Sequence, residues 1–305
     1  MDARGGTAPR RRGGWHRRLR RTEWLTGILL AMPALAIAGA PAGAGTEALT
    51  GQAIVERYLA TQDTPSEMAL IAMVVSSPGA KPKEYRFLTV HHKRADGGRD
   101  GLLRLLRPHD VEGVALIVEE PKAGAVRLSL FLPEVGKVRP LADNAQAGAF
   151  LGSNFTFEDL RREIPDVHDY ERLEDATVRD IPCFRVRARE KPGSPSAYAW
   201  RDLLIARDTF DLLRIEFQGR DGRLTKTLNA YEYRSAAVHG ETRRPRRVVM
   251  RAVNSDAWTD FTVIEGRVGQ TVPEDLFTPR RQESWKPADV EEFIFQFGIT
   301  VNGAS

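Results

Sequence analysis

The chain has 305 residues, of which 45 are basic and 41 acidic, so its formal net charge is +4. The basic excess lies within the first 44 residues, which hold eight arginines and two acids. The remaining 261 residues hold 37 basic and 39 acidic side chains, a net charge of −2. This charge gives no support for nucleic-acid binding. The single cysteine, Cys183, excludes an internal disulfide and a cysteine-rich metal site, and we interpret it as a packing residue.

Residues 1–44 have the layout of a cleavable secretory signal. Seven arginines between residues 10 and 21 precede an apolar stretch over residues 24–40, and small residues crowd together over 39–45. Candidate A-x-A cleavage sites end at Ala40, Ala42 or Ala44. We therefore expect an exported protein whose mature part, residues 45–305, is a single soluble domain in the periplasm.

Two alternatives to this interpretation concern membrane anchoring and the export route. An uncleaved anchor is disfavoured because Pro33 and Gly39 interrupt the apolar run and leave it short of the ~20 apolar residues that a span needs. The pair Arg20-Arg21 weakly resembles a twin-arginine signal, but a chance pair is at least as frequent in so arginine-rich a segment. The cleavage site and the export route both stay open.

The mature chain has the pattern of a mostly β domain that begins with a helix. Residues 47–61 place apolar side chains at helical spacing. The β-type runs cover residues 68–75, 84–94, 102–107, 113–120, 126–133, 182–189, 198–207, 212–218, 223–233, 246–253 and 257–267. Alternation with period two is typical of an antiparallel sheet with one dry face, and about ten strands seldom stay flat. The prediction is a mainly β (α+β) fold, a strongly curved antiparallel sheet forming an unclosed barrel with a few covering helices.

The segment over residues 150–175 separates the two runs of strands. Thr156 is a typical helix N-cap residue, and Asp159 is the acid three positions later. We therefore predict a short helix from Glu158 to about Glu163. A final helix is predicted over residues 288–298.

Catalytic motifs are missing from the sequence. The histidines of the mature chain stand at positions 91, 92, 109, 168 and 239. His91 and His92 are neighbours on a predicted strand, so they point to opposite faces and do not share a metal ion. No H-E-x-x-H, G-x-S-x-G, Walker or G-x-G-x-x-G pattern occurs. Adjacent acids such as Glu158-Asp159 are interpreted as solvated faces. We expect no catalytic residue, metal or cofactor, and an exported hydrolase is the weakest hypothesis.

One central stretch is distinctive. It runs from Leu132-Pro133 through Val138-Arg139 to the segment FLGSNFTFEDL at residues 150–160. This stretch resembles the family of outer-membrane lipoprotein-sorting proteins. Weaker matches follow at Asp169-Tyr170 and over residues 180–187, 221–226 and 272–278, so that the resemblance covers roughly residues 50–285.

The resemblance implies a LolA/LolB-like fold, in which a curved, unclosed sheet is covered by helices on the inside. It also implies carriage of acyl chains of lipoproteins or other lipids through the periplasm toward the outer membrane, together with an inner-membrane exporter. No catalytic motif comes with the family. A second hypothesis keeps the fold but makes the protein an envelope sensor or adaptor that binds a membrane partner.

An acyl chain in water costs ~0.8 kcal/mol per CH₂, so a carrier needs an apolar hollow that opens and closes. The candidate lining residues are Phe87, Leu128, Leu130, Phe131, Phe184, Val186, Ile215 and Phe217. A loop dense in apolar side chains is the candidate gate or partner contact, through Phe150, Leu151, Phe155 and Phe157. The competing interpretation is that all these side chains are ordinary core and that the loop only plugs a sheet edge.

Overall fold

The computed structural model describes residues 49–122, 125–192, 196–235 and 242–299. The chain divides into two units, residues 1–47 and 48–305. The predicted signal segment lies outside the described residues, and the structure below is that of the second unit. No helix among the described residues is long and apolar enough to cross a membrane.

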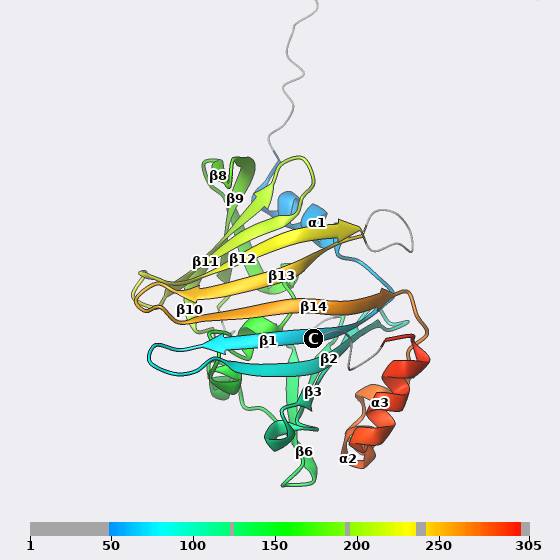
Figure 1. Ribbon diagram of the computed structural model, residues 1–305. Helices are drawn as coiled ribbons and strands as arrows, with labels where there is room; N and C mark the ends of the chain where they lie inside the picture. The colour runs from blue at the N-terminus through cyan, green and yellow to red at the C-terminus, as the bar shows by residue number, and fades with distance from the viewer. Residues whose placement is uncertain (1–48, 123–124, 193–195, 236–241, 300–305) are drawn as a thin grey trace, which may run out of the picture. The chain divides into compact units, whose positions relative to one another are not determined.

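The described residues form one 14-stranded antiparallel sheet (Figure 1). Its first six strands are β1 (Ser66–Ser76), β2 (Lys83–Lys93), β3 (Arg99–Arg107), β4 (Ala115–Glu120), β5 (Arg127–Leu132) and β6 (Lys137–Pro140). The others are β7 (His168–Arg172), β8 (Ala176–Val178), β9 (Ile181–Glu190), β10 (Tyr198–Ala206), β11 (Leu212–Gly219), β12 (Leu224–Ser235), β13 (Arg243–Ala252) and β14 (Trp258–Val268). The order is β6-β5-β4-β3-β2-β1-β14-β13-β12-β11-β10-β9-β7, with β8 beside β9.

Strands β6 and β7 stand at the two ends of this order and do not pair with each other, so the sheet is curved but unclosed, as predicted. The long-range pairing of β1 with β14 joins the strands that precede residue 141 to those that follow residue 167. The pairing of β1 with β14 shifts register between Leu70 and Ile71, where β14 has one extra residue, Ile264. Strand β1 itself alternates regularly, so Leu70 packs on one face of the sheet and Ile71 on the other.

The two faces of the sheet carry different covers. Helices α2 (Pro279–Ser284) and α3 (Pro287–Gln296) pack against strands β1–β5 on the face that we call the outer face. Helix α1 (Gly51–Thr61) and residues 141–167, which we call the inner segment, pack on the opposite, inner face. Figure 1 shows the strands bending around α1 and the inner segment, with α2 and α3 on the outside.

Local chemistry fixes the position of α1. The hydroxyl of Thr50 accepts a hydrogen bond from the backbone N–H of Ala53 at 3.2 Å and caps the helix, so that it begins at Gly51. The first two residues of the predicted range 47–61 lie outside the described residues. A side chain at Gly51 would meet the backbone of β7, because a Cβ there would lie 2.8 Å from the carbonyl oxygen of Tyr170. Glycine therefore lets the first turn of α1 lie directly on β7.

The predicted strands all occur, within a few residues at their ends. The predictions missed β6, β7, β8 and α2, which are short. The predicted helix from Glu158 to Glu163 is wrong: it is a single 3-10 turn, Glu158–Leu160, after which Arg161 takes extended backbone (φ −78°, ψ 152°). The predicted final helix is confirmed as α3.

Candidate functional site

The inner segment lies across the apolar inner surface of β1–β5. Phe150 is 2 % exposed, and its ring meets that of Phe157 edge-on at 5.6 Å between centroids. These side chains share one cluster with Leu151 and with strand residues that include Met73, Val75, Tyr85, Phe87, Leu103, Leu105, Leu116, Val118, Leu128 and Leu130. The predicted gate loop thus fills the space that the curved sheet encloses.

The same segment also reaches the other half of the sheet. Phe155 is 3 % exposed and stacks on Phe261 of β14, with centroids 4.3 Å apart and planes 8° apart. It shares a cluster with Phe217 of β11 and Met250 of β13. The inner segment therefore bridges strands on both sides of the β1–β14 pairing.

Helix α1 covers the remaining inner surface. Its side chains Ile54 and Val55 are fully buried and pack with Phe184, Val186 and other residues of β9 and β10. Together, α1 and the inner segment seal the apolar part of the inner face.

Seven of the eight predicted lining residues lie on this inner face. Phe87, Leu128 and Leu130 belong to the cluster that holds Phe150 and Phe157. Phe184 and Val186 pack against α1, Phe217 packs with Phe155, and Ile215 packs against both of these clusters. Phe131 faces the other way: it belongs to the outer cluster, where Arg104 lies 5.5 Å from its ring centroid. The cause is strand alternation, since Phe131 follows Leu130 directly.

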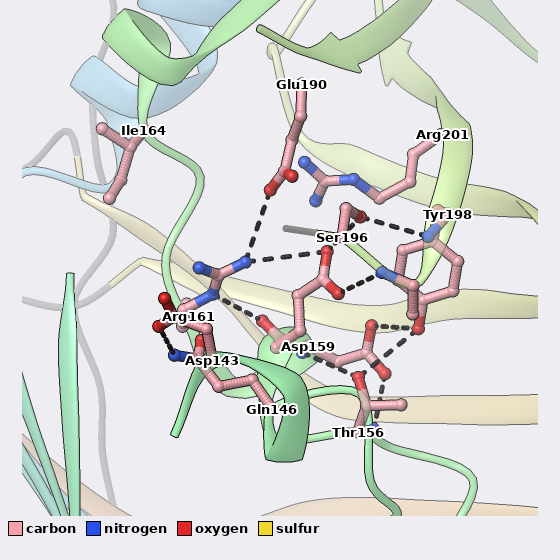
Figure 2. Close-up of polar contacts among 12 residues, drawn as sticks. Asp143, Gln146, Thr156, Asp159, Arg161, Ile164, Glu190, Ser196, Tyr198 and Arg201 are labelled. Carbon is pink, nitrogen blue, oxygen red and sulfur yellow. Dashed lines mark hydrogen bonds and ion pairs between the residues drawn. The ribbon is translucent and has the colours of Figure 1, made fainter. Parts of the chain in front are cut away.

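A buried polar network, which we call the anchor network, ties the inner segment to the sheet (Figure 2). Its centre is Asp159, whose side chain is 2 % exposed. This carboxylate accepts hydrogen bonds from the backbone N–H of Thr156 at 2.7 Å, the hydroxyl of Tyr198 at 2.8 Å and the Nζ of Lys226 at 2.5 Å. The hydroxyl of Thr156 in turn accepts from the N–H of Asp159, which confirms the predicted capping pair.

The neighbouring acid, Glu158, makes a second attachment. It is 7 % exposed and accepts hydrogen bonds from the hydroxyl of Ser196 at 2.6 Å and from the backbone N–H of Ala197 at 2.9 Å. The prediction that Glu158-Asp159 form a solvated face is therefore wrong. Their partners lie about 40 to 70 residues further along the chain, which sequence proximity does not reveal.

Two further carboxylates near the segment have shifted pKa values. Burial opposes ionisation of Glu163, but the positive charge of Arg201, whose guanidinium lies 3.0 Å away, outweighs it and lowers the pKa of Glu163. Burial, assisted by the charge of Glu158, raises the pKa of Glu190, whose Oε2 has no hydrogen-bond partner among the described residues. Arg161 lies 3.5 Å from Glu190 and 3.6 Å from Glu158, and Figure 2 shows its contact with Glu190.

His168 is neutral in this network. Its Nδ1 donates to the carbonyl of Ile164 at 3.0 Å, and its Nε2 accepts from the guanidinium of Arg201 at 2.7 Å. Burial lowers the pKa of His168, and so does the nearby charge of Arg201. A ring nitrogen that accepts from an arginine carries no proton, which agrees with this shift.

The space that remains open on the inner face is lined by charged side chains as well as apolar ones. A cavity of about 230 Å³ lies between the end of α1, strands β1–β4, β13 and the inner segment, and we call it the arginine cavity. Its lining includes Arg99, Arg161, Arg162 and Arg244, together with Glu67, Asp100 and Glu120. Two neighbouring cavities, of about 350 and 140 Å³, share residues with it. The predictions named none of these arginines, although the pair Arg161-Arg162 directly after the apolar loop was a usable signal.

Within the part of the chain that the structure describes, no three His, Cys, Asp or Glu side chains come together as a metal site. His91 lines the arginine cavity, whereas His92 stacks on Phe277 at 6.2 Å between centroids on the outer face. The arrangement is suited to binding, because an apolar surface lies beneath the inner segment and α1, and the arginine cavity lies beside it.

Comparison with known proteins agrees with the fold. Residues 97–283 match the model of a family described as "Uncharacterized protein". A search of the curated proteins gives no significant match.

Three solved structures are similar to the chain. An outer-membrane lipoprotein-sorting protein domain from Vibrio parahaemolyticus has a TM-score of 0.71 and 20% identity, covering 76% of this chain and 98% of that one. A DUF1329 family protein from Desulfovibrio piger has a TM-score of 0.71 and 18% identity, covering 76% and 97%. A LolA superfamily protein from Nitrosomonas europaea has a TM-score of 0.61 and 19% identity, covering 76% and 98%. The expected LolA-like fold is thus confirmed.

Proposed function

We propose that this protein carries acyl chains in the bacterial periplasm. The premise is that the chain belongs to the family whose model matches residues 97–283 and has the LolA-like fold. The cargo would be the acyl chains of lipoproteins or other lipids, moved toward the outer membrane from an inner-membrane exporter. The observation that carries the proposal is the cover of the inner face, an apolar surface sealed by a loop and a helix that are not part of the sheet.

The arrangement described above would be the closed state of such a carrier. Phe150, Phe155 and Phe157 occupy the volume that an acyl chain would fill, and they shield the sheet from water in its absence. A chain of 16 carbons gains on the order of 10 kcal/mol from burial at ~0.8 kcal/mol per CH₂. That gain is comparable with the cost of exposing two or three buried phenylalanines, at about 3–5 kcal/mol each.

The cargo contacts that we propose are the inner-face members of the predicted set. They are Phe87, Leu128, Leu130, Phe184, Val186, Ile215 and Phe217. Phe131 is set apart from them by the sheet itself, because its side chain packs toward α2 and α3. The inner segment would be the gate, and the hydrogen bonds of the anchor network would hold it closed.

The first experiment asks whether the protein holds lipid. The mature chain, purified from cells without detergent, should show added mass in native mass spectrometry and lipid in an organic extract. Phe217→Asp should reduce that lipid several-fold, because a charge on the inner face opposes an acyl chain. Phe295→Asp is the matched control, since Phe295 is 70 % exposed on α3.

A second experiment asks whether the inner segment is the gate. The side-chain oxygen of Asn154 accepts from the hydroxyl of Thr259 at 3.0 Å, which joins the segment to β14. The double variant Asn154→Cys/Thr259→Cys, oxidised and checked by thiol titration, should take up lipid far more slowly than the same protein after reduction. Equal uptake in both states would rule out the gate.

The alternative function is an envelope sensor or adaptor on the same fold. Its support is that the cavities left open are lined largely by charged residues. An adaptor would purify without lipid and would retain one membrane protein on an affinity column. The first experiment measures the lipid content, and the affinity column measures whether a membrane protein is retained.

A further inference from the structure

Arg162 stands where three cavities meet. It lines the arginine cavity and both of its neighbours, and it is the residue that the three linings share. A guanidinium has five N–H donors and stays charged in proteins. Among the described residues, the hydrogen bond of Arg162 is a long one, 3.5 Å from Nη2 to the carbonyl oxygen of Leu59, and no carboxylate lies within ion-pair distance. Most of its donors therefore face open space.

The neighbouring arginines are engaged, but they add to the positive field. Arg244 is paired with Glu67 at 2.8 Å, and Arg99 is paired with Asp63. Burial, together with the charges of Arg162 and Arg244, lowers the pKa of Arg99 to about 10. Burial likewise lowers the pKa of Arg162, with Arg244 adding to the effect. These groups are close enough to repel one another.

The acids of the arginine cavity compensate this field only in part. Asp100 is paired with Arg94, which does not line the cavity, and Glu67 is held by Arg244. Glu120 attracts Arg99 and Arg162 electrostatically but forms no ion pair with either among the described residues. Three of the four lining arginines have carboxylate partners of their own, since Arg99 pairs with Asp63, Arg161 with Glu190 and Arg244 with Glu67. Among the described residues that line the cavity, Arg162 is thus the arginine without an ion pair, and Glu120 is the carboxylate without one.

We propose that Arg162, with Arg99 and Arg244 around it, binds a phosphate group in the arginine cavity. Arginine suits this ligand, because its planar fork donates two parallel hydrogen bonds to phosphate oxygens. The cavity volume of about 230 Å³ accommodates a phosphate with its ester substituent. The site goes beyond the proposed carriage of acyl chains, because free phosphate would occupy it as well as a phospholipid headgroup.

The position of the site connects it to the apolar surface. Leu160 lines the arginine cavity and also packs against the clusters that hold Phe150 and Phe155. A phosphate bound at Arg162 therefore lies at the end of the surface that the inner segment covers. A phospholipid would place its charged group at Arg162 and its acyl chains toward Leu160.

The test compares three ligands on the mature protein by isothermal titration calorimetry. These are inorganic phosphate, a short-chain phosphatidylglycerol below its micelle concentration, and an uncharged monoacylglycerol of the same chain length. Arg162→Gln should weaken binding of phosphate and phosphatidylglycerol by roughly tenfold to a hundredfold, as expected for lost charged hydrogen bonds. Binding of the monoacylglycerol should not change. Tighter binding of phosphatidylglycerol than of phosphate would identify the headgroup as the source.

Two variants make the result decisive. Arg223→Gln is the matched control, because Arg223 is 88% exposed and lies outside the three cavities. Arg162→Lys keeps the positive charge but lacks the planar guanidinium, so it should weaken phosphate binding less than Arg162→Gln does. It replaces Arg162→Gln in the test if the glutamine variant does not fold. Wild-type-like phosphate and phosphatidylglycerol binding in Arg162→Gln, or no binding of either ligand by the wild type, overturns the proposal. Monoacylglycerol binding without phosphate binding would leave acyl carriage standing while this site fails.

Discussion

Phe155 of the inner segment lies flat on Phe261 of β14, with ring centroids 4.3 Å apart. Phe261 in turn meets Phe87 of β2 edge-on, at 5.6 Å. Phe155 is thus connected, through the ring of Phe261, to β2, which is the second strand from β14 in the sheet. Because the loop also inserts Phe150 among the residues of β2–β5, the inner segment and the curvature of the sheet depend on each other.

We therefore predict that Phe155→Ala loosens the inner segment. A buried phenylalanine cut back to alanine costs about 3–5 kcal/mol. Denaturant unfolding should show that loss, and the amide hydrogens of residues 150–160 should exchange faster than those of β9 and β10. Phe295→Ala, at an exposed position, should change stability by less than about 0.5 kcal/mol. Unchanged exchange over 150–160 would contradict the prediction.

A second prediction concerns the anchor network. Removing one partner of the buried pair Asp159–Lys226, by Asp159→Asn or Lys226→Met, should cost about 3–5 kcal/mol, because each leaves an uncompensated buried group. The double variant should cost clearly less than the two single losses added together, as a double-mutant cycle measures. The pair Lys137–Glu283 is the control, since its lysine is 70% exposed and surface pairs contribute about 0–1 kcal/mol. Simple additivity at Asp159–Lys226 would mean that the two residues act independently.

The sequence made the curved sheet predictable because its strands alternate. In β9, Phe184 and Val186 lie on the inner face while Arg185 and Arg187 bind Asp202 on the other, which is the pattern that the residues display in order. Strand β6, Lys137–Pro140, was missed because four mostly exposed residues carry no alternation to read. Local periodicity thus predicted the sheet and the dry face of β9, but strands β3 and β4 are buried on both faces and carry no such alternation.

The site was less predictable for a physical reason. The sequence identified the apolar loop, but it could not show that Glu158 and Asp159 are buried, because burial depends on Ser196, Tyr198 and Lys226. The arginine cavity was missed likewise: Arg99, Arg162 and Arg244 come from separate parts of the chain. Long-range contacts of this kind have no local signature.

A third prediction follows from the raised pKa of Glu190. The folded chain holds this proton to a higher pH than the unfolded chain does, so stability falls as pH rises through the window above the ordinary glutamate pKa of about 4.3. Glu190→Gln should therefore be more stable than the wild type at pH 7, and the difference should shrink toward about pH 4. In a domain of this size, about 1 kcal/mol corresponds to roughly 2–4 °C in Tm.

Thermal unfolding from pH 4 to pH 8 measures this difference. Glu171→Gln is the control, because Glu171 is 58% exposed on β7 and its partner Arg189 is also exposed. Its Tm should differ little from that of the wild type across the range. A Glu190→Gln variant less stable than the wild type at pH 7 would show that the contact with Arg161 outweighs the burial of the carboxylate.

The last prediction concerns the outer face, where Arg104 is 2 % exposed and has no carboxylate partner among the described residues. Its guanidinium donates to the side-chain oxygen of Gln282 at 2.7 Å and to the carbonyl oxygen of Trp285 at 2.6 Å. Burial lowers the pKa of Arg104 to about 10, so the group is still charged at pH 7. Arg104→Met removes the cost of burying that charge, but it takes the donor from buried acceptors of Gln282 and Trp285.

Two opposed effects thus decide the outcome of Arg104→Met. Each orphaned acceptor costs about 1–3 kcal/mol, and the arginine also lies over the ring of Trp285, at 5.4 Å from its centroid. We expect a net loss of about 2–4 kcal/mol on these grounds, with faster hydrogen exchange in α2 and α3 and unchanged exchange in α1. Arg139→Met, at an exposed position on β6, is the matched control. If Arg104→Met were instead as stable as the wild type, the cost of burying the charge would equal the value of its hydrogen bonds, and the packing of α2 and α3 would not depend on this arginine.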